Sequence, residues 1–193
     1  IVTRTKAGDM VTCNLNSINL GQTSDEELEE NIALQVRMLD NVITINQFPV
    51  PETRVTSEKY RAIGLGTSGY HHYLVKHKVQ WESDEHLAVA DTLFENIAYA
   101  AIKASMELAK EKGAYPAFKG SQWETGEYFE RRGYTSERWQ QLRADVAKYG
   151  IRNGYLMAIA PTGSTSNIAN TTAGIDPIFK KFFIEEKKGS FTP

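Results

Sequence analysis

The stretch Ala160–Ile168 (APTGSTSNI) has the residue types of an anion-binding turn, and it directly follows an apolar run. Pro161 stops a strand, and Gly163 permits a tight turn that a ligand can approach closely. The three hydroxyl residues 164–166 offer donors, and one of them can cap a following helix. Backbone N–H groups at the start of that helix, together with its dipole, favour an anion. The glycine has no lysine after it, so the turn is not a Walker A loop. The alternative is a Ser/Thr-rich helix cap that binds no ligand.

Cys13 is the one cysteine in the chain. A single cysteine excludes an intramolecular disulfide and any metal site built from several cysteines. Taken by itself, a lone cysteine is typical of a small buried apolar residue.

Residues 64–69 (GLGTSG) match G-x-G-x-x-G between an expected strand and an expected helix. A dinucleotide site also needs an acidic residue about 20 positions further on, at the end of a second strand. Asp84 and Glu85 lie near that distance, but at the start of a helix. The pattern therefore favours glycines at Gly64, Gly66 and Gly69 that let a helix pack closely on a strand. A small Rossmann-type dinucleotide binder remains an alternative.

The histidines do not have the spacing of a metal site. They are His71, His72, His77 and His86. Pairs five or six residues apart do not share a helical face as the two histidines of H-E-x-x-H do. We expect surface or hydrogen-bonded, partly buried histidines and no metal site.

The composition is that of an ordinary globular protein, with 41% hydrophobic and 24% charged residues among 193. The net charge of −2 gives no bulk attraction for nucleic acid or an anionic membrane. No apolar run approaches the length of roughly 18 residues that a membrane span needs. We expect a cytoplasmic protein without nucleic-acid or membrane partners.

Three helices are indicated by caps and periodicity. Ser24 and Glu27 form a capping box before an apolar stripe of Leu28, Ile32, Val36, Leu39 and Ile43. Pro49 and Pro51 are expected to close that unit. A helix starting at Ser83 and capped by Gly113 has a stripe of Leu87, Phe94, Ile97, Ala101, Ser105 and Leu108. A third helix is predicted over about Ser136 to Tyr149, capped by Gly150.

Strands are predicted in the first half of Met10–Leu20, at Arg61–Leu65 and at Tyr155–Ala160. The last is a continuous apolar run, typical of a parallel strand buried on both faces. Ser68–His77 is predicted to be a helix, and Tyr115–Tyr134 carries no assignable pattern. The order predicts an α/β fold with parallel strands. So few strands leave unpaired edges, which fits half a barrel better than a whole domain. We interpret residues 1–193 as a single partial domain, incomplete at both ends.

Four segments, in order, resemble one family, the large (catalytic) subunit of ribonucleotide reductase, especially its class I members. They are residues 12–20 (TCNLNSINL), 61–69 (RAIGLGTSG), 149–153 (YGIRN) and 160–177 (APTGSTSNIANTTAGIDP). The order and spacing hold along nearly the whole chain. The resemblance implies a ten-stranded α/β barrel of two five-stranded halves, with this chain supplying much of the second half.

The resemblance also implies an activity, the reduction of ribonucleotides to deoxyribonucleotides by thiyl-radical chemistry. Cys13 stands where the family has the second member of the reducing cysteine pair, and its partner lies outside the chain. The resemblance assigns the substrate-phosphate loop to Pro161, Thr162, Gly163, Ser164 and Thr165. Some class I enzymes carry an acidic residue in place of Gly163, so the subclass stays open.

The family's radical-bearing cysteine belongs to a segment that would end at about Ile1–Thr3, so the chain is expected to begin just after it. We therefore expect the chain alone to be inactive. The implied partners are a nucleoside diphosphate substrate, the rest of the large subunit, a radical-generating small subunit and a thioredoxin-like reductant. We expect no cofactor in this segment, because the family uses a metal-linked radical in a separate subunit (class I) or adenosylcobalamin (class II). The alternative is a non-catalytic module that only pairs with another barrel half.

Overall fold

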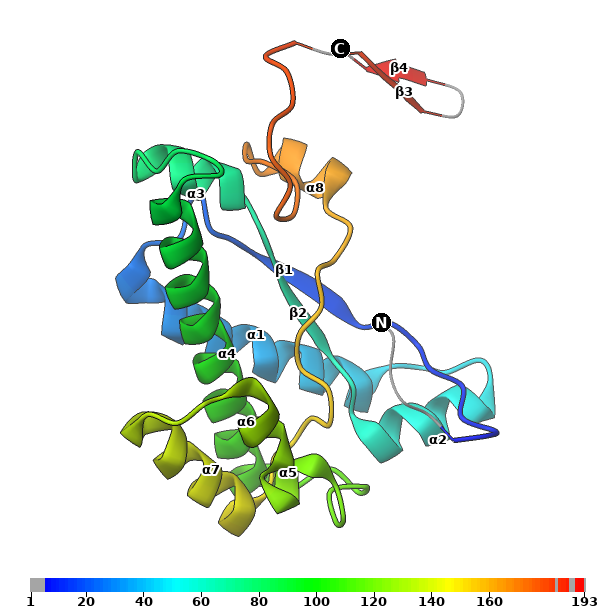
Figure 1. The fold of residues 1–193 in the computed structure, drawn as a ribbon. Coiled ribbons are helices and arrows are strands. Elements are labelled where there is room, and N and C mark those ends of the chain that lie inside the picture. Colours follow the sequence, from blue (N-terminus) through cyan, green and yellow to red (C-terminus); the bar gives the residue numbers. More distant parts are fainter. Residues whose placement is uncertain (1–5, 183, 188–189, 193) are drawn as a thin grey trace.

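The computed structural model describes residues 6–182, 184–187 and 190–192. The expectation for residues 1–3 therefore lies outside the described part. The chain alternates short strands with helices (Figure 1). In chain order the elements are β1 Leu15–Asn19, α1 Asp25–Ile45, α2 Pro51–Tyr60, β2 Gly64–Ser68, α3 Tyr70–Lys76, α4 Asp84–Lys112, α5 Gln122–Thr125, α6 Glu127–Arg132, α7 Glu137–Tyr149, α8 Gly163–Ile168, β3 Glu185–Lys187 and β4 Ser190–Thr192.

The centre of the fold is a parallel arrangement of three extended segments. β1 pairs with β2 in parallel, in a register that runs from Leu15–Gly64 to Asn19–Ser68. Residues 155–160 follow the other edge of β2, where Leu65 N donates to Leu156 O (2.8 Å) and Ala158 N donates to Leu65 O (3.0 Å). Within the described residues this sheet stays open at both edges. The predicted α/β fold with parallel strands is confirmed.

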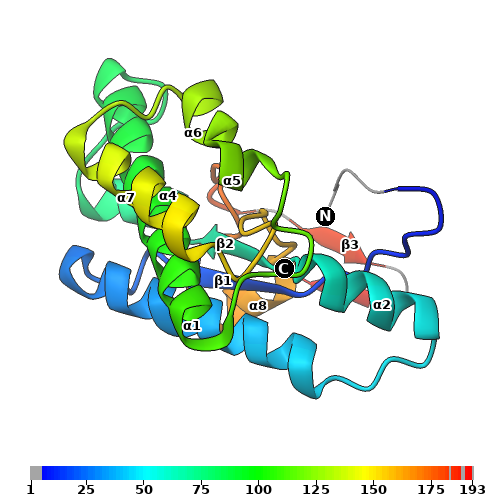
Figure 2. The same cartoon turned by 90° about the horizontal axis from the view of Figure 1, so that it is seen from below.

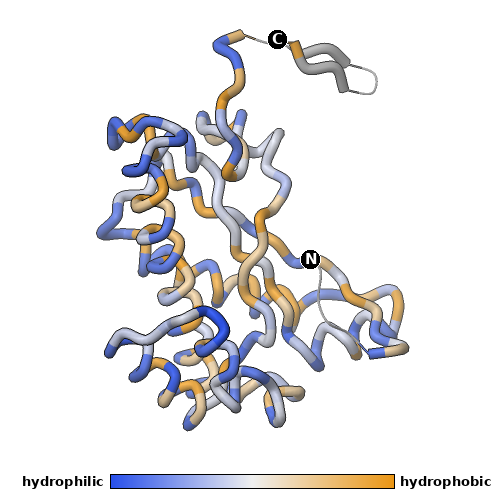
Figure 3. Tube along the Cα trace, viewed as in Figure 1, coloured by the Kyte–Doolittle hydropathy of each residue, from blue (hydrophilic) through white to orange (hydrophobic). Residues whose placement is uncertain are grey.

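Helix α1 packs on β1, and α1 and α4 pack on each other (Figure 2). The predicted α1 stripe from Leu28 to Ile43 is buried. On α4, Ile97, Ala101 and Leu108 are buried as expected, but Leu87 is 66% exposed, contrary to the prediction. Figure 3 shows the hydrophobic stretches along the central extended segments and on α4. No helix in the described ranges is both long and apolar enough to cross a membrane.

The predicted caps are largely confirmed. Ser24 and Glu27 form the full capping box of α1, since each side chain accepts from the backbone of the other residue. Ser83 caps α4 by accepting from His86 N, and Gly113 follows its last turn. α7 runs from Glu137 to Tyr149, between Ser136 and Gly150.

Three predicted boundaries were wrong. The strand lies in the second half of 10–20, because the first half packs on α2, where Met10 N donates to Thr56 Oγ1 (2.9 Å). Pro51 does not end the first helical unit; it begins α2, since a proline at the first helical position needs no N–H. Arg61 ends α2 in a left-handed conformation (φ 45°), so β2 starts three residues later than predicted.

Residues 155–160 lie along β2 but form only one isolated parallel bridge, Leu65 with Met157, in place of the predicted strand, and they are not buried on both faces. Leu156 and Ala160 are buried, whereas Met157 and Ile159 are 38% and 53% exposed. Met157 lines a hollow with residues of α4 and α7, among them Phe94, Ala98 and Trp139. The unassigned stretch 115–134 contains the short helices α5 and α6.

Candidate functional site

The loop after the third extended segment turns directly into α8. Thr162 is the residue before the helix, and Ser166 N donates to Thr162 O (2.8 Å) as the first intrahelical bond. The amides of residues 163–165 precede that bond, and amides in this position have no acceptor within their own helix. Residues 163–165 are exposed, while Thr162 is buried. The loop therefore presents its first-turn amides at the surface.

The capping prediction for this loop was wrong. None of the three hydroxyls at 164–166 caps α8, and the N-cap residue Thr162 makes no side-chain cap either. Instead, Thr162 Oγ1 accepts from Gly174 N (2.7 Å) and ties the loop to the segment after α8. Thr165 Oγ1 and Ser166 Oγ donate to carbonyls one turn back, those of Thr162 (3.3 Å) and Gly163 (3.2 Å).

A hollow of about 450 Å³ lies between this loop and β1. It is lined by Leu15, Asn16, Ser17, Asn19, Ser68, Ala160, Pro161, Thr162, Thr165 and Ala169. None of these residues is charged. An anion held here would rely on amides and hydroxyls of this chain rather than on a cation. The hollow lies at the carboxyl ends of parallel strands, where α/β proteins usually bind ligands.

β1 directs alternate side chains toward the helices and toward the loop. Asn14 Nδ2 donates to Leu39 O on α1 (2.8 Å), and Ile18 is buried in the core. On the other face, Asn19 Nδ2 donates to Ala169 O, just after α8 (3.4 Å). Odd-numbered side chains of β1 thus face the loop.

Cys13 is exposed and lies two residues before β1. The Thr12 hydroxyl contacts Ser57 Oγ on α2 (3.1 Å), and Asn14 contacts α1. Both even-numbered neighbours therefore point to the helix side. Cys13 is not among the residues that line the hollow.

The family profile described as "Ribonucleotide reductase, barrel domain" matches residues 1–192. The chain belongs to this family. It is 57% identical to the "Ribonucleoside-diphosphate reductase subunit alpha" of Treponema pallidum (strain Nichols), over 100% of this chain and 23% of that protein. The proteins of the same name from Helicobacter pylori (strain 26695) and Chlamydia pneumoniae are 41% and 38% identical, over 97% and 95% of this chain. The chain spans 26% and 20% of their lengths. The open parallel sheet is thus part of a ribonucleotide reductase barrel.

The glycine-rich turn of this barrel segment packs three backbones together. Gly69 N donates to Thr172 O (2.7 Å), and Tyr70 N donates to Gly174 O (3.4 Å). These amides are already satisfied by protein carbonyls, which removes the donors that a dinucleotide phosphate would need. A Cβ at Gly69 would lie 2.3 Å from Thr171 Oγ1, and one at Gly66 would lie 2.3 Å from Ala158 O. Gly66 and Gly69 thus permit close packing of neighbouring non-helical segments, whereas the prediction was close packing of a helix on a strand.

All four histidines have hydrogen-bond partners. His71 and His72 of α3 hold the segment after α8: His71 Nδ1 accepts from Ile178 N (2.7 Å), and His72 Nδ1 contacts Thr171 Oγ1 (3.1 Å). His77 Nδ1 bonds Tyr73 O, and His86 Nδ1 accepts from Glu82 N. Within the described ranges no group of three or more His, Cys, Asp or Glu side chains could hold a metal ion.

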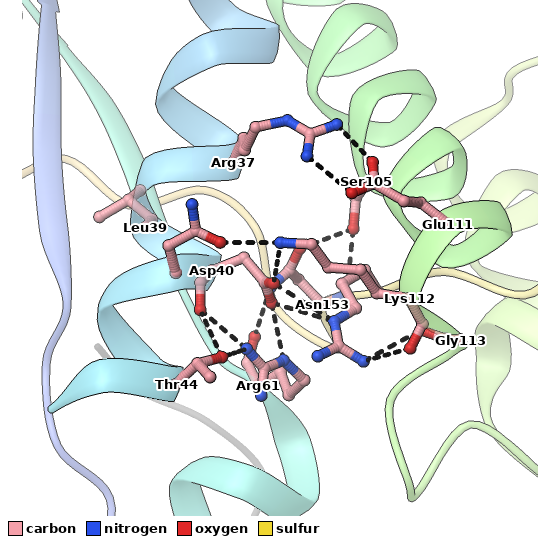
Figure 4. A network of polar contacts seen from close by, with 12 residues as sticks. Arg37, Leu39, Asp40, Thr44, Arg61, Ser105, Glu111, Lys112, Gly113 and Asn153 are labelled. Atoms are coloured by element: carbon pink, nitrogen blue, oxygen red, sulfur yellow. Dashed lines mark hydrogen bonds and ion pairs between the residues drawn. The ribbon is translucent and has the colours of Figure 1, made fainter.

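A buried polar network, not predicted from the sequence, fixes the segment that leads to the loop (Figure 4). Its centre is the fully buried Asp40 of α1. Asp40 Oδ1 accepts from Arg61 Nε (2.7 Å), from Arg152 Nε (3.3 Å) and from Asn153 Nδ2 (3.2 Å). Asn153 is held from the other side by Ser105 Oγ of α4, which donates to its Oδ1 (2.8 Å).

The network has more positive than negative side chains. Besides the two guanidiniums, Lys112 Nζ lies 3.7 Å from Asp40 Oδ2. Arg152 Nη1 donates to the carbonyls of Lys112 and Gly113, at the C-terminus of α4. The negative end of the α4 dipole therefore offsets part of the excess charge. The network joins α1, α4 and residues 151–153, and so sets where the 155–160 segment begins.

A second polar cluster holds the chain that leads into Cys13. The Asp9 carboxylate accepts from Tyr60 Oη (2.6 Å), from Lys59 Nζ (2.9 Å) and from Lys6 N (2.8 Å). The Tyr60 hydroxyl first, then the Lys6 amide and Lys59, lower the pKa of Asp9 to about 2. Residues 6–12 are thereby anchored on α2.

Proposed function

We propose that the chain is a segment of the catalytic subunit of a ribonucleoside-diphosphate reductase, supplying one redox cysteine and the loop that binds the substrate's phosphates. The observation that carries the proposal is the hollow between β1 and the 161–165 loop, together with the exposed Cys13 two residues before β1. The sequence identity over the full chain supports the same assignment.

In the proposed reaction the Cys13 thiol and a second thiol outside the chain are oxidised together. They give up two electrons and two protons and form a disulfide. The ribose loses its 2′-hydroxyl as water and gains hydrogen at that carbon. The disulfide requires the two Cα atoms to come within about 5.5–6 Å, and a reductant of the thioredoxin class must then restore the thiols. We propose that this segment binds no radical-generating cofactor itself.

The proposed phosphate contacts come from the exposed first turn of α8. Its amides at residues 163–165 point outward, and the Ser164 hydroxyl lies among them. Because the hollow carries no cation, each donor contributes a sizeable share of the interaction with the phosphate.

The role of Cys13 is tested in the complete catalytic subunit. Cys13→Ser is expected to abolish multiple turnover with a thioredoxin-type reductant, because the pair can no longer form a disulfide. Thr12→Ala, which changes a neighbouring side chain that faces α2, is the control and should cycle normally. Normal cycling of Cys13→Ser contradicts the proposal.

The role of the loop is tested by titrating a nucleoside diphosphate into the same subunit. Ser164→Ala is expected to weaken binding about tenfold, as expected for a hydrogen bond to a charged group. Gly163→Ala adds a Cβ that meets nothing within 4 Å and should leave the loop folded. Absence of nucleotide binding, or no effect of Ser164→Ala, would instead favour a non-catalytic module that only pairs with another part of the barrel.

A further inference from the structure

β1 carries side-chain polar atoms that have no hydrogen-bond partner within the described residues. The side-chain oxygens Asn16 Oδ1, Ser17 Oγ and Asn19 Oδ1 are buried and accept or donate no hydrogen bond within the described residues. The described residues contain six buried side-chain oxygens without a hydrogen-bond partner, and these are three of them. All three residues line the hollow beside the loop. Buried polar atoms cost free energy unless they have a partner, so their concentration on one short strand indicates that something else completes them.

Ser17 is the residue of the three that is best placed to meet a ligand. Asn16 is on the helix side of β1, with Asn14 and Ile18. The Asn19 amide bonds Ala169 O, and its Oδ1 would lie 2.8 Å from a Cβ at Gly69, so it is turned toward the glycine-rich turn. Ser17 lies between Leu15 and Asn19 on the loop side.

The hydroxyl of Ser17 matches what an anion in the hollow would still need. The loop can supply amide and hydroxyl donors from one wall only, and no charged side chain lines the hollow. A phosphate has several oxygens that accept hydrogen bonds, and they point in different directions. A hydroxyl donor on the opposite wall would complete its coordination.

The position of Ser17 along β1 also fits. Cys13 and Ser17 are four residues apart, so their Cα atoms are separated by at most about 14 Å. A nucleotide lying along β1 with its sugar beside Cys13 would extend its diphosphate tail toward Ser17 and the 161–165 loop.

We propose that the Ser17 hydroxyl donates a hydrogen bond to a phosphate oxygen of the bound nucleotide, from the wall opposite the loop. Asn19 is a positioning residue in this arrangement, because its bond to Ala169 O sets the distance between β1 and α8. The inference rests on the proposed function of the loop.

The test compares a nucleoside diphosphate with the same nucleoside without phosphates, by calorimetry on the complete catalytic subunit. Ser17→Ala is expected to weaken binding of the diphosphate about tenfold and to leave binding of the nucleoside unchanged. Ser17→Thr keeps the hydroxyl and should restore most of the affinity. Thr67→Ala removes another buried hydroxyl without a partner, one that does not line the hollow, and should change neither affinity.

The outcomes separate this inference from the proposed function. If Ser17→Ala leaves diphosphate binding unchanged while Ser164→Ala weakens it, the Ser17 contact is wrong and the loop assignment stands. If Ser17→Ala weakens the diphosphate and the nucleoside equally, the hydroxyl meets the sugar or base, and the phosphate contact is again wrong. If neither serine affects diphosphate binding, both the inference and the phosphate-loop proposal fail.

Discussion

Asp40 and Arg61 form an ion pair inside the protein, with Arg61 Nε 2.7 Å from Asp40 Oδ1. The Asp40 side chain is fully buried, and only 7% of the Arg61 side chain is exposed. The pair is 21 residues apart in sequence and joins α1 to the turn before β2. Because Arg152 and Asn153 bind the same carboxylate, one side chain holds three segments in place.

Removing this carboxylate should therefore destabilise the chain strongly. Asp40→Ala leaves two guanidiniums without their buried counter-charge, and breaking a buried pair in this way costs about 3–5 kcal/mol. The measurement is the free energy of unfolding in urea. Arg37→Ala is the matched control, since it breaks a pair with Glu111 in which both side chains are about half exposed and should cost at most about 1 kcal/mol. Equal effects of the two changes would mean that the Asp40 network does not stabilise the fold.

Gly69 should tolerate a methyl group less well than another glycine of similar backbone conformation. Gly69 has φ +72°, and a Cβ there would lie 2.3 Å from Thr171 Oγ1 and 2.9 Å from Gly21 N. Gly133 has φ +68° and ψ 26°, with nothing within 4 Å of a Cβ. Gly133→Ala should cost about 1 kcal/mol for the backbone conformation alone. Gly69→Ala should cost about 1–3 kcal/mol more through crowding, as measured by urea denaturation. A difference of zero would contradict the close packing of this turn.

The features that the sequence predicted correctly are those encoded within a few neighbouring residues. The capping box at Ser24 and Glu27 and the apolar stripe from Leu28 to Ile43 depend only on helical spacing, and both are present. The features that were missed depend on distant partners. Residues 10–14 do not form a strand, because Thr56 and Ser57 of α2 bind them. The exposure of Met157 and Ile159 depends on which face the helices cover, and an apolar run does not carry that information.

The candidate site also combines features set by neighbouring residues with features that depend on distant ones. The loop at 161–165 was recognised from its local residue types, whereas Ser17 was not singled out. The composition of β1 was a usable signal, because asparagine is depleted in strands, and here Asn16, Ser17 and Asn19 all line one hollow. The Asp40 network offered no comparable signal, since its members come from positions 40, 61, 105, 112 and 152–153 and only the fold brings them together.

Asp9 should keep its charge at unusually low pH. Its pKa is lowered from 3.8 to about 2, first by the hydrogen bond from Tyr60. Because the folded-state value is the lower one, the stabilising contribution is fully present above about 3.8 and is lost as the pH falls through about 2. The check is an NMR titration of the Asp9 carboxyl carbon. Tyr60→Phe should move the titration midpoint upward, toward 3.8, and an unchanged midpoint would contradict the assigned cause.

Thr162 should act on the loop through Gly174 rather than through its own helix. Its buried Oγ1 accepts from Gly174 N at 2.7 Å, so Thr162→Val keeps the side-chain shape but leaves that amide without its acceptor. We expect a loss of about 1–3 kcal/mol in stability and faster hydrogen exchange at the Gly174 amide. Thr162→Ser keeps the oxygen and should retain most of the protection. If the Gly174 amide exchanges equally slowly in Thr162→Val, the tie between the loop and the segment after α8 does not depend on this hydroxyl. In the complete catalytic subunit, the same change should raise the KM for the nucleoside diphosphate more than it lowers kcat, because it disturbs where the loop lies and no group that takes part in the redox step.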